Sequence, residues 1–183
     1  MIYYTADLHL GHENVIRHCA RPFSSAEEMD ETLVRHWNAR VHRNDTIYIV
    51  GDFFFRNRKP AEEYLDALKG KKHLIIGNHD LSWMRKAPSP DYWMKYFESV
   101  SPMSSIRDSG ALVTLCHYPM LSWKHQSRSF MIHGHIHANT DMDFWPCIKA
   151  RDNLLNAGVD VNGFTPVTFE ELMENNRRFK EMY

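Results

Sequence analysis

The sequence predicts an α/β fold with two β-sheets. Over the first half of the chain, short apolar runs alternate with stretches of helical periodicity, whereas in the second half the apolar runs mostly follow one another. The alternation is typical of βαβ units, and the later succession of strands indicates a more β-rich second half. The 183 residues fit one domain, 1–183, because no repeat, low-complexity tract or linker-like segment divides them.

The strands expected in the first half are runs rich in β-branched and aromatic residues. They cover residues 2–6, 46–50 and 72–76. The helices expected between them cover residues 13–19, 25–41 and 60–69. Helix 25–41 is the clearest, because Ser25 and Glu28 fit a capping box and apolar residues recur on one face. Helix 60–69 has Pro60 at its start and Gly70 just past its end.

The second half is expected to hold three strands and one long helix. The strands cover residues 111–116, 130–132 and 153–161. Residues 168–182 close the chain as a helix, because Thr168 and Glu171 fit a second capping box and Phe169 and Leu172 begin an apolar face.

Composition excludes several classes of protein. Hydrophobic residues make up 43% and charged residues 25%, as in ordinary globular proteins. The net charge of −1 provides no general attraction to nucleic acid or to an anionic membrane. No apolar run reaches the roughly 18 residues of a spanning helix, and the N-terminus lacks the basic region of a signal peptide. Three widely spaced cysteines argue against a disulfide framework and for a reducing compartment, so a cytoplasmic location is expected.

The twelve histidines are the unusual feature of the composition, and many of them belong to polar clusters that directly follow apolar runs. Because the carboxyl ends of strands line the ligand crevice of open α/β sheets, these clusters are expected to converge on one site. Four of the eight glycines lie within them, which favours sharp turns and close backbone contacts. The clusters are residues 7–12, 51–52, 77–80, 117–119 and 134–137.

The residue types in these clusters are suited to binding metal ions. Asp, His and amide oxygens are ligands that borderline divalent cations accept. Asp7 and His9, and likewise His135 and His137, are spaced so that both members of each pair can turn toward one cavity. Asp52 is the candidate to bridge two cations, because it stands alone after a glycine. Two ions about 3.5–4 Å apart can activate water and stabilise a phosphoryl displacement.

These clusters, in this order, resemble the calcineurin-like metallophosphoesterases, over about residues 7–137. Within that superfamily the chain is most similar to the small stand-alone bacterial and phage phosphoesterases, through the stretches 7–14 and 156–162. The resemblance implies a four-layer α/β/β/α sandwich, in which two packed mixed sheets are flanked by helices. It also implies two divalent metal ions at the strand ends and a hydroxide between them that attacks phosphorus.

The resemblance also assigns individual roles. His79 would contact the phosphate and protonate the leaving oxygen, and Asp52 would bridge the metals. The first metal would be held by Asp7, His9 and His137, and the second by Asn78, His117 and His135.

The chain departs from the family pattern at one place. Protein phosphatases of this family carry GDxxDRG, whereas residues 51–57 have Phe55 at the second aspartate and keep the arginine as Arg56. The aspartate that usually orients the catalytic histidine is therefore missing, and Asp80, next to His79, is the candidate to replace it. Arg56 is a candidate phosphate ligand. The departure argues against phosphoprotein phosphatase activity more than against hydrolysis.

Several residues keep two interpretations. His12 either faces the substrate or fixes a ligand from behind. Asp160 could hydrogen-bond a liganding imidazole, but an ordinary loop carboxylate is favoured. His133 is interpreted as a strand residue, and residues 53–55 as core rather than a binding platform. Trp123 and Trp145 either stack on a base, or pack in the interior or at a dimer contact.

The sequence thus predicts a phosphoric ester hydrolase with two divalent ions, Mn²⁺ first, with Fe, Ni, Co or Zn as alternatives. The expected substrate is a phosphodiester or small phosphoester, whether nucleotide, nucleic acid or small metabolite. A phosphomonoesterase and a non-catalytic scaffold of the same fold are the alternatives. No membrane association and no obligate protein partner are expected, and the protein is expected to be a monomer or homodimer.

Overall fold

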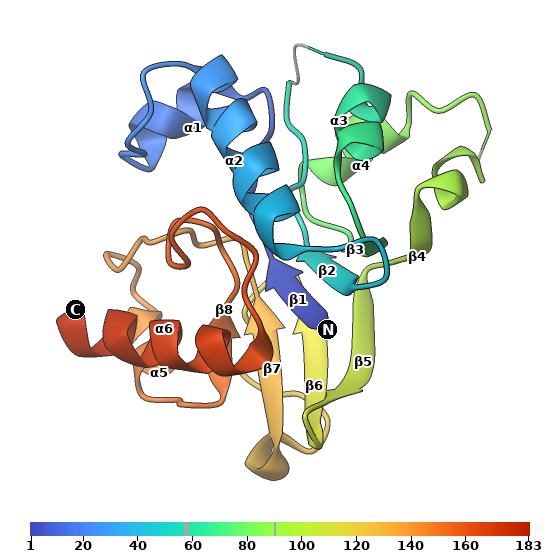
Figure 1. Ribbon diagram of the computed structural model, residues 1–183. Helices are drawn as coiled ribbons and strands as arrows, with labels where there is room; N and C mark the ends of the chain where they lie inside the picture. The colour runs from blue at the N-terminus through green and yellow to red at the C-terminus, as the bar shows by residue number, and fades with distance from the viewer. Residues whose placement is uncertain (57–58, 90) are drawn as a thin grey trace.

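The computed structural model describes residues 1–56, 59–89 and 91–183; Asn57 of the stretch 51–57 lies outside the described residues. Two four-stranded sheets pack face to face, with helices on their outer sides (Figure 1). The strand orders are β1-β2-β3-β4 and β5-β6-β7-β8. The predicted α/β/β/α arrangement is therefore confirmed.

The first sheet is built from βαβ units. All three strand pairs of this sheet are parallel, so the expectation of two mixed sheets is wrong for this one. Parallel neighbours need crossover connections, and the helices α1 to α4 supply them. The strands are β1 (Ile2–Thr5), β2 (Thr46–Val50), β3 (Lys71–Ile75) and β4 (Phe97–Ser101); the helices are α1 (Glu13–His18), α2 (Ala26–Arg40), α3 (Ala61–Ala67) and α4 (Asp80–Met84).

The second sheet is mixed. Strands β5 (Met103–Asp108) and β6 (Ala111–Cys116) form an antiparallel hairpin, and β7 (Ser129–His133) and β8 (Leu154–Asn156) then add in parallel. The predicted strand 153–161 is shorter than expected, because Gly158 donates its N–H to the Asn156 side chain and the chain turns away. This turn returns the chain toward β1, where Gly158 bridges Ala6.

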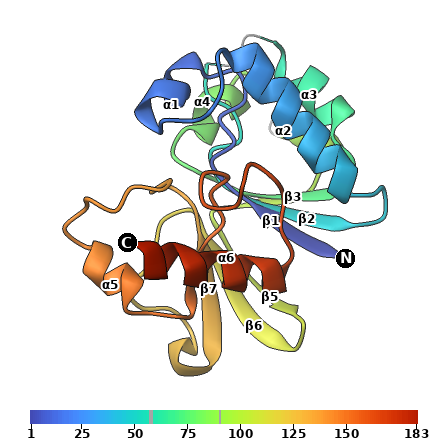
Figure 2. The same cartoon turned by 60° about the vertical axis from the view of Figure 1, so that its left-hand side comes forward.

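The remaining elements close the edges and ends of the sheets. Helix α6 (Phe169–Met182) lies against β8 and β1, and α5 (Trp145–Lys149) lies near its C-terminal end (Figure 2). Two short 3-10 helices cover Tyr92–Lys95 and Gln126–Arg128. None of the described helices is long and apolar enough to cross a bilayer.

The two predicted capping boxes differ in the structure. At α6 the box is complete, because Thr168 accepts the Glu171 N–H and Glu171 accepts the Thr168 N–H. At α2, Ser25 accepts the Glu28 N–H at 3.1 Å, but the Glu28 carboxylate bonds Ser24 instead of Ser25. Ser25 therefore caps α2 as predicted, whereas the Glu28 carboxylate accepts hydrogen bonds from Ser24, the residue before Ser25.

The apolar interior has three parts, each between defined layers. Residues of β1, β2 and β3 meet β6, β7 and β8 between the sheets, including Tyr4, Val50 and Leu115. A second cluster lies beneath α2 and α3 and includes fully buried Phe53 and Phe54, so two of the three phenylalanines are core as predicted. The third cluster, on the outer side of the second sheet, buries Trp123 and Trp145, which supports packing for both tryptophans.

Candidate functional site

The loops that follow the strands are tied to one another by backbone hydrogen bonds. The Asp7 N–H donates to Gly51 O at 3.0 Å, and the Gly134 N–H donates to His117 O at 3.0 Å. The first bond links the loops after β1 and β2, and the second links the loops after β6 and β7. The predicted convergence of the polar clusters is therefore what the structure shows.

The first group of donor atoms belongs to Asp7, His9 and His137, whose candidate ligand atoms all lie within 4.8 Å of one another. Asp7 is fully buried, and both of its oxygens accept the His135 N–H, at 3.0 and 2.9 Å. Both ring nitrogens of His9 are buried without a hydrogen-bond partner among the described residues. A buried imidazole left without a partner is expected at a site that a further group completes.

The second group consists of Asp52, His117 and His135, also within 4.8 Å of one another. Asn78 joins it, since its Oδ1 lies 2.9 Å from His117 Nε2 and 3.0 Å from His135 Nδ1. His117 Nδ1 donates to the Val50 carbonyl at 3.0 Å, so Nε2 is the nitrogen that faces the group.

Asp52 lies between the two groups. Its Oδ2 is 3.4 Å from His117 Nε2 and 3.7 Å from His9 Nε2, so one oxygen faces an imidazole of each group. Its Oδ1 accepts the His79 N–H at 2.9 Å. Gly77 permits this position, because a Cβ there would lie 2.3 Å from Asp52 Oδ1.

The backbone of the site is in an uncommon conformation. Positive φ values for residues other than glycine cost free energy and often mark functional sites. Of the ten such residues in the described chain, five are predicted ligands: Asp7 (φ 55°), His9 (51°), Asp52 (54°), His135 (73°) and His137 (50°). The fold therefore imposes the directions of these side chains.

The two aspartates differ in their pKa values. Burial raises the pKa of Asp7 to about 6. Burial acts in the same direction on Asp52, but the hydrogen bond and charge of His117 outweigh it and lower the pKa to about 2. Asp52 is therefore an anion throughout the neutral range, as a bridging ligand must be.

The imidazoles divide in a similar way. Burial lowers the pKa of His9 well below its usual value, so this ring is neutral. Burial also opposes protonation of His117 and His137, but the Asp52 and Asp160 carboxylates outweigh it and raise their pKa values to about 9 and about 10. The His117 proton on Nε2 faces Asp52 between the donor groups, where a cation would displace it, whereas the His137 proton on Nδ1 faces Asp160 on the other side of the ring. The donor set therefore fits divalent cations, which accept carboxylate, imidazole and amide oxygen.

His79 stands at the edge of the two groups. Its side chain is 34% exposed, and its Nε2 lies 3.9 Å from Asp52 Oδ2. The ring of Phe55 packs on it, with ring centroids 4.1 Å apart, and also contacts the His12 ring at 4.7 Å. Phe55 thus occupies the space beside His79 where the family pattern has an aspartate.

The expectation that Asp80 orients the His79 ring is not supported by the contacts of Asp80. This carboxylate is fully buried and accepts hydrogen bonds from groups other than that ring. It holds together the turns after β2 and β3, and its partners are the N–H groups of Asp52, Phe53 and Gly77 and the Trp83 indole.

The other candidates take different positions. Arg56 is exposed, with its guanidinium carbon 5.4 Å from the centroid of the Phe55 ring. His12 lines the pocket described below, and its Nδ1 is buried without a hydrogen-bond partner among the described residues, so both interpretations of this residue stay open. His133 is a buried residue of β7, as predicted.

Two residues that position the site were missed or undervalued. No sequence motif singles out Arg21, and the sequence favours an ordinary loop carboxylate at Asp160. Asp160 Oδ2 lies 2.8 Å from His137 Nδ1 and is held by a two-pronged ion pair with Arg21, at 2.8 and 2.9 Å. Arg21 also donates to the carbonyls of Asp7 and Leu8, at 2.7 and 3.0 Å. The sequence signal for Asp160 is that a carboxylate of its kind could hydrogen-bond a liganding imidazole, and no comparable signal marks Arg21.

A pocket of about 610 Å³ opens beside the donor groups. It runs from the histidines at 9, 79, 135 and 137 to the end of α1 and the loop after His137. Its position gives a ligand access to both groups from one side. A separate cleft between α2 and α3, of about 210 Å³, is lined by none of these histidines.

Comparison with known proteins agrees with the geometry. The chain is 33% identical over 175 residues to the uncharacterized protein MJ1445 of Methanocaldococcus jannaschii, covering 94% of this chain and 89% of that protein. It is 29% identical to the Gene 66 protein of Mycobacterium phage L5, covering 83% and 91% of the two chains. Its fold is similar to the crystal structure of the protein of unknown function AQ665 from Aquifex aeolicus, with a TM-score of 0.71, 24% identity and coverage of 95% and 98%.

The family assignment rests on nearly the whole chain. The family model for calcineurin-like phosphoesterases matches residues 1–179, a range that contains both donor groups and the two sheets that support them. Sequence pattern, fold and site therefore agree, and the chain belongs to the calcineurin-like phosphoesterase family.

Proposed function

We propose that this protein is a metal-dependent phosphodiesterase that uses two divalent cations, Mn²⁺ first among them. The observation that supports this most is the position of Asp52, whose Oδ2 faces an imidazole of each donor group within 4 Å. Members of the family bind divalent metals in general, and here two adjacent sets of suitable ligands share one carboxylate.

The ligand sets follow from the two groups. Asp52 belongs to both, with Asp7, His9 and His137 on one side and Asn78, His117 and His135 on the other. Bound cations supply an electrostatic field that lowers the pKa of water and neutralises charge on phosphoryl oxygens. The protein holds their ligands in place through the backbone of the strand ends and the buried contacts described above.

His79 is the proposed general acid. It lies at the pocket edge, partly exposed, beside Asp52 and against Phe55. In the reaction, an oxygen from water forms a bond to phosphorus while the bond to the leaving oxygen breaks. His79 gives its proton to that oxygen, so that an alcohol and a phosphate monoester are released. The Phe55 ring restricts the orientation of the imidazole by packing, in place of a carboxylate hydrogen bond.

The pocket favours a diester over a monoester. A phosphate monoester has one organic group, whereas a diester has two. The roughly 610 Å³ beside the donor groups leaves space for the second organic group once the phosphate is placed at the donor groups. The scaffold alternative is disfavoured, because each of the seven predicted ligand positions holds a residue able to bind a metal.

The test combines metal content with turnover. Protein loaded with Mn²⁺ is expected to hold two ions per chain and to hydrolyse bis(p-nitrophenyl) phosphate with higher kcat/KM than p-nitrophenyl phosphate. Asp52→Asn should lower turnover by about 100-fold or more, because it weakens the shared ligand. Asp143→Asn, at an exposed position outside the pocket lining, is the matched control and should leave turnover unchanged.

Fewer than one bound ion together with no turnover would support the scaffold instead. A preference for the monoester would replace the phosphodiesterase with a phosphomonoesterase.

A further inference from the structure

The pocket has two chemically different ends. At the metal end it is lined by the candidate ligands and by His79. The rest of the lining, called the far end below, comes from the end of α1 and the loop after His137, where Val15 is buried and Met142 is half-buried. This far end is where an organic group attached to the phosphate would lie.

Among the described residues, the far end has no side chain of fixed positive charge to compensate a second negative charge; its polar side chains besides Asp141 include His18 and Asn139. None of the lining residues that the structure describes is a lysine or arginine, the side chains that bind phosphate oxygens. The fixed charge that does line it is a carboxylate, Asp141. Asp141 is exposed, and its N–H is held by Asn139 Oδ1 at 2.9 Å, which fixes the loop that carries it.

We propose that the pocket selects phosphodiesters whose retained alcohol group carries no second phosphate, and that Asp141 enforces this selection. The inference rests on the proposed function and narrows its substrate class. It excludes nucleic-acid backbones and bisphosphorylated metabolites, and favours diesters with an uncharged or cationic group. His79 is partly exposed and lines the metal end of the pocket, so the leaving group is placed there and the group retained on phosphorus at the far end.

The size of the effect follows from charge repulsion. Two like unit charges near contact distance in water repel by about 1 kcal/mol, which weakens a binding constant several-fold. A phosphate dianion carries two such charges, so its repulsion by a carboxylate is larger. A second phosphate at the far end should therefore lower kcat/KM by about tenfold at low ionic strength. Salt should reduce this ratio, because the charges lie in solvent. A purely steric exclusion would not respond to salt.

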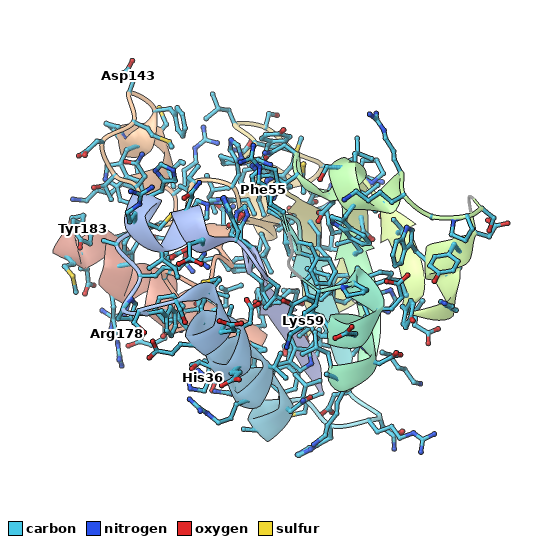
Figure 3. All side chains as sticks on the ribbon, turned by 90° about the horizontal axis from the view of Figure 1, so that it is seen from above. His36, Phe55, Lys59, Asp143, Arg178 and Tyr183 are labelled. Carbon is cyan, nitrogen blue, oxygen red and sulfur yellow. The ribbon has the colours of Figure 1, made fainter. Side chains whose placement is uncertain are left out.

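The experiment compares two substrates that differ only in that charge. They are the p-nitrophenyl ester of thymidine 5′-phosphate and the same ester with an added 3′-phosphate, assayed at pH 8 with Mn²⁺ at low and high salt. Asp141→Lys should bring the two kcat/KM values to within about twofold or invert them. Asp143→Lys is the matched control, because Asp143 points outward at the tip of the same loop (Figure 3), and it should keep the wild-type ratio.

Binding is measured separately from turnover. Isothermal titration with thymidine 5′-phosphate and thymidine 3′,5′-bisphosphate should show the same preference and the same reversal in Asp141→Lys. Equal kcat/KM for the two esters, or a ratio that Asp141→Lys leaves unchanged, would overturn the inference while leaving the phosphodiesterase intact. If the Mn²⁺-loaded protein hydrolyses neither ester, the proposed function fails, and equal affinities in the titrations would then overturn the inference as well.

Discussion

Arg21 is the residue whose replacement should best reveal how the site is supported. The Arg21 side chain is fully buried, and its guanidinium pairs with the Asp160 carboxylate, whose side chain is 4% exposed. Arg21→Met keeps most of the volume and removes the charge. It leaves the buried Asp160 with His137 but without the guanidinium, and it frees the carbonyls of Asp7 and Leu8.

The expected cost can be estimated from these contacts. Breaking a buried ion pair by removing one partner costs about 3–5 kcal/mol, because the other charge stays buried. Total stabilities of domains are about 5–15 kcal/mol, so the variant should remain folded but be clearly weakened. Removing groups that orient metal ligands typically lowers metal affinity about 10–100-fold. That loss should fall on the group containing Asp7 and His137, since Arg21 contacts the Asp7 carbonyl and also Asp160, which hydrogen-bonds His137.

The assays are urea unfolding and Mn²⁺ titration by calorimetry. We expect Arg21→Met to unfold at lower urea and to bind one of two ions with reduced affinity. The double variant Arg21→Met/Asp160→Asn should recover part of the stability, because the buried charge that has lost the guanidinium is then removed as well. Arg40→Met is the control, since the partly exposed pair between Arg40 and Glu171 should contribute below about 1 kcal/mol.

The reasoning is refuted if Arg21→Met costs no more free energy of unfolding than Arg40→Met. It is also refuted if Mn²⁺ binding in Arg21→Met is unchanged at both sites. Either result would mean that the ion pair between Arg21 and Asp160 does not support the position of His137.

Three further predictions follow from the site and the core. His79→Gln should preserve Mn²⁺ content and slow hydrolysis by about 100-fold or more for poor leaving groups, but less for p-nitrophenol; equal slowing would argue against a general acid. Gly77→Ala should displace Asp52 and lower Mn²⁺ affinity in a calorimetric titration, whereas Gly110→Ala, where an added Cβ meets nothing within 4 Å, should retain it. Burial lowers the pKa of Lys180 to about 8 from 10.5, so between these values the unfolded chain binds the proton and the native chain does not. The free energy of unfolding should therefore rise by roughly 2 kcal/mol from pH 8 to 10 in urea titrations, and Lys180→Met should lack that rise.

The strands with strong apolar patterns, the edge strand β1 among them, could be predicted from the sequence, whereas the edge strands β4 and β5 could not. Residues 46–50 and 111–116 match β2 and β6 at both ends, because both are β-branched, apolar and interior to their sheets. Strand β5 was missed because its residues alternate between exposed and half-buried, with none fully buried. Such a segment pairs through its backbone, and side-chain hydrophobicity carries little signal for it.

The candidate site shows the same division. Residues such as Asp7, His9 and Asp52 could be predicted because they lie in short motifs at strand ends. The contribution of Arg21 could not, since its partner Asp160 is 139 residues away in the chain and the pair forms only by packing. The role of Phe55 was also out of reach, because a missing aspartate does not show that an aromatic ring will lie against His79.

The left-handed backbone at five of the candidate ligands has a consequence for the evolution of such a protein. Each of these residues costs about 1–3 kcal/mol that glycine would relieve. A descendant released from selection for chemistry could therefore gain thermal resistance by replacing them one at a time. The present sequence keeps histidine or aspartate at all five positions. It therefore has a lower folding stability than the fold could reach, in exchange for side chains able to bind metal ions at the strand ends.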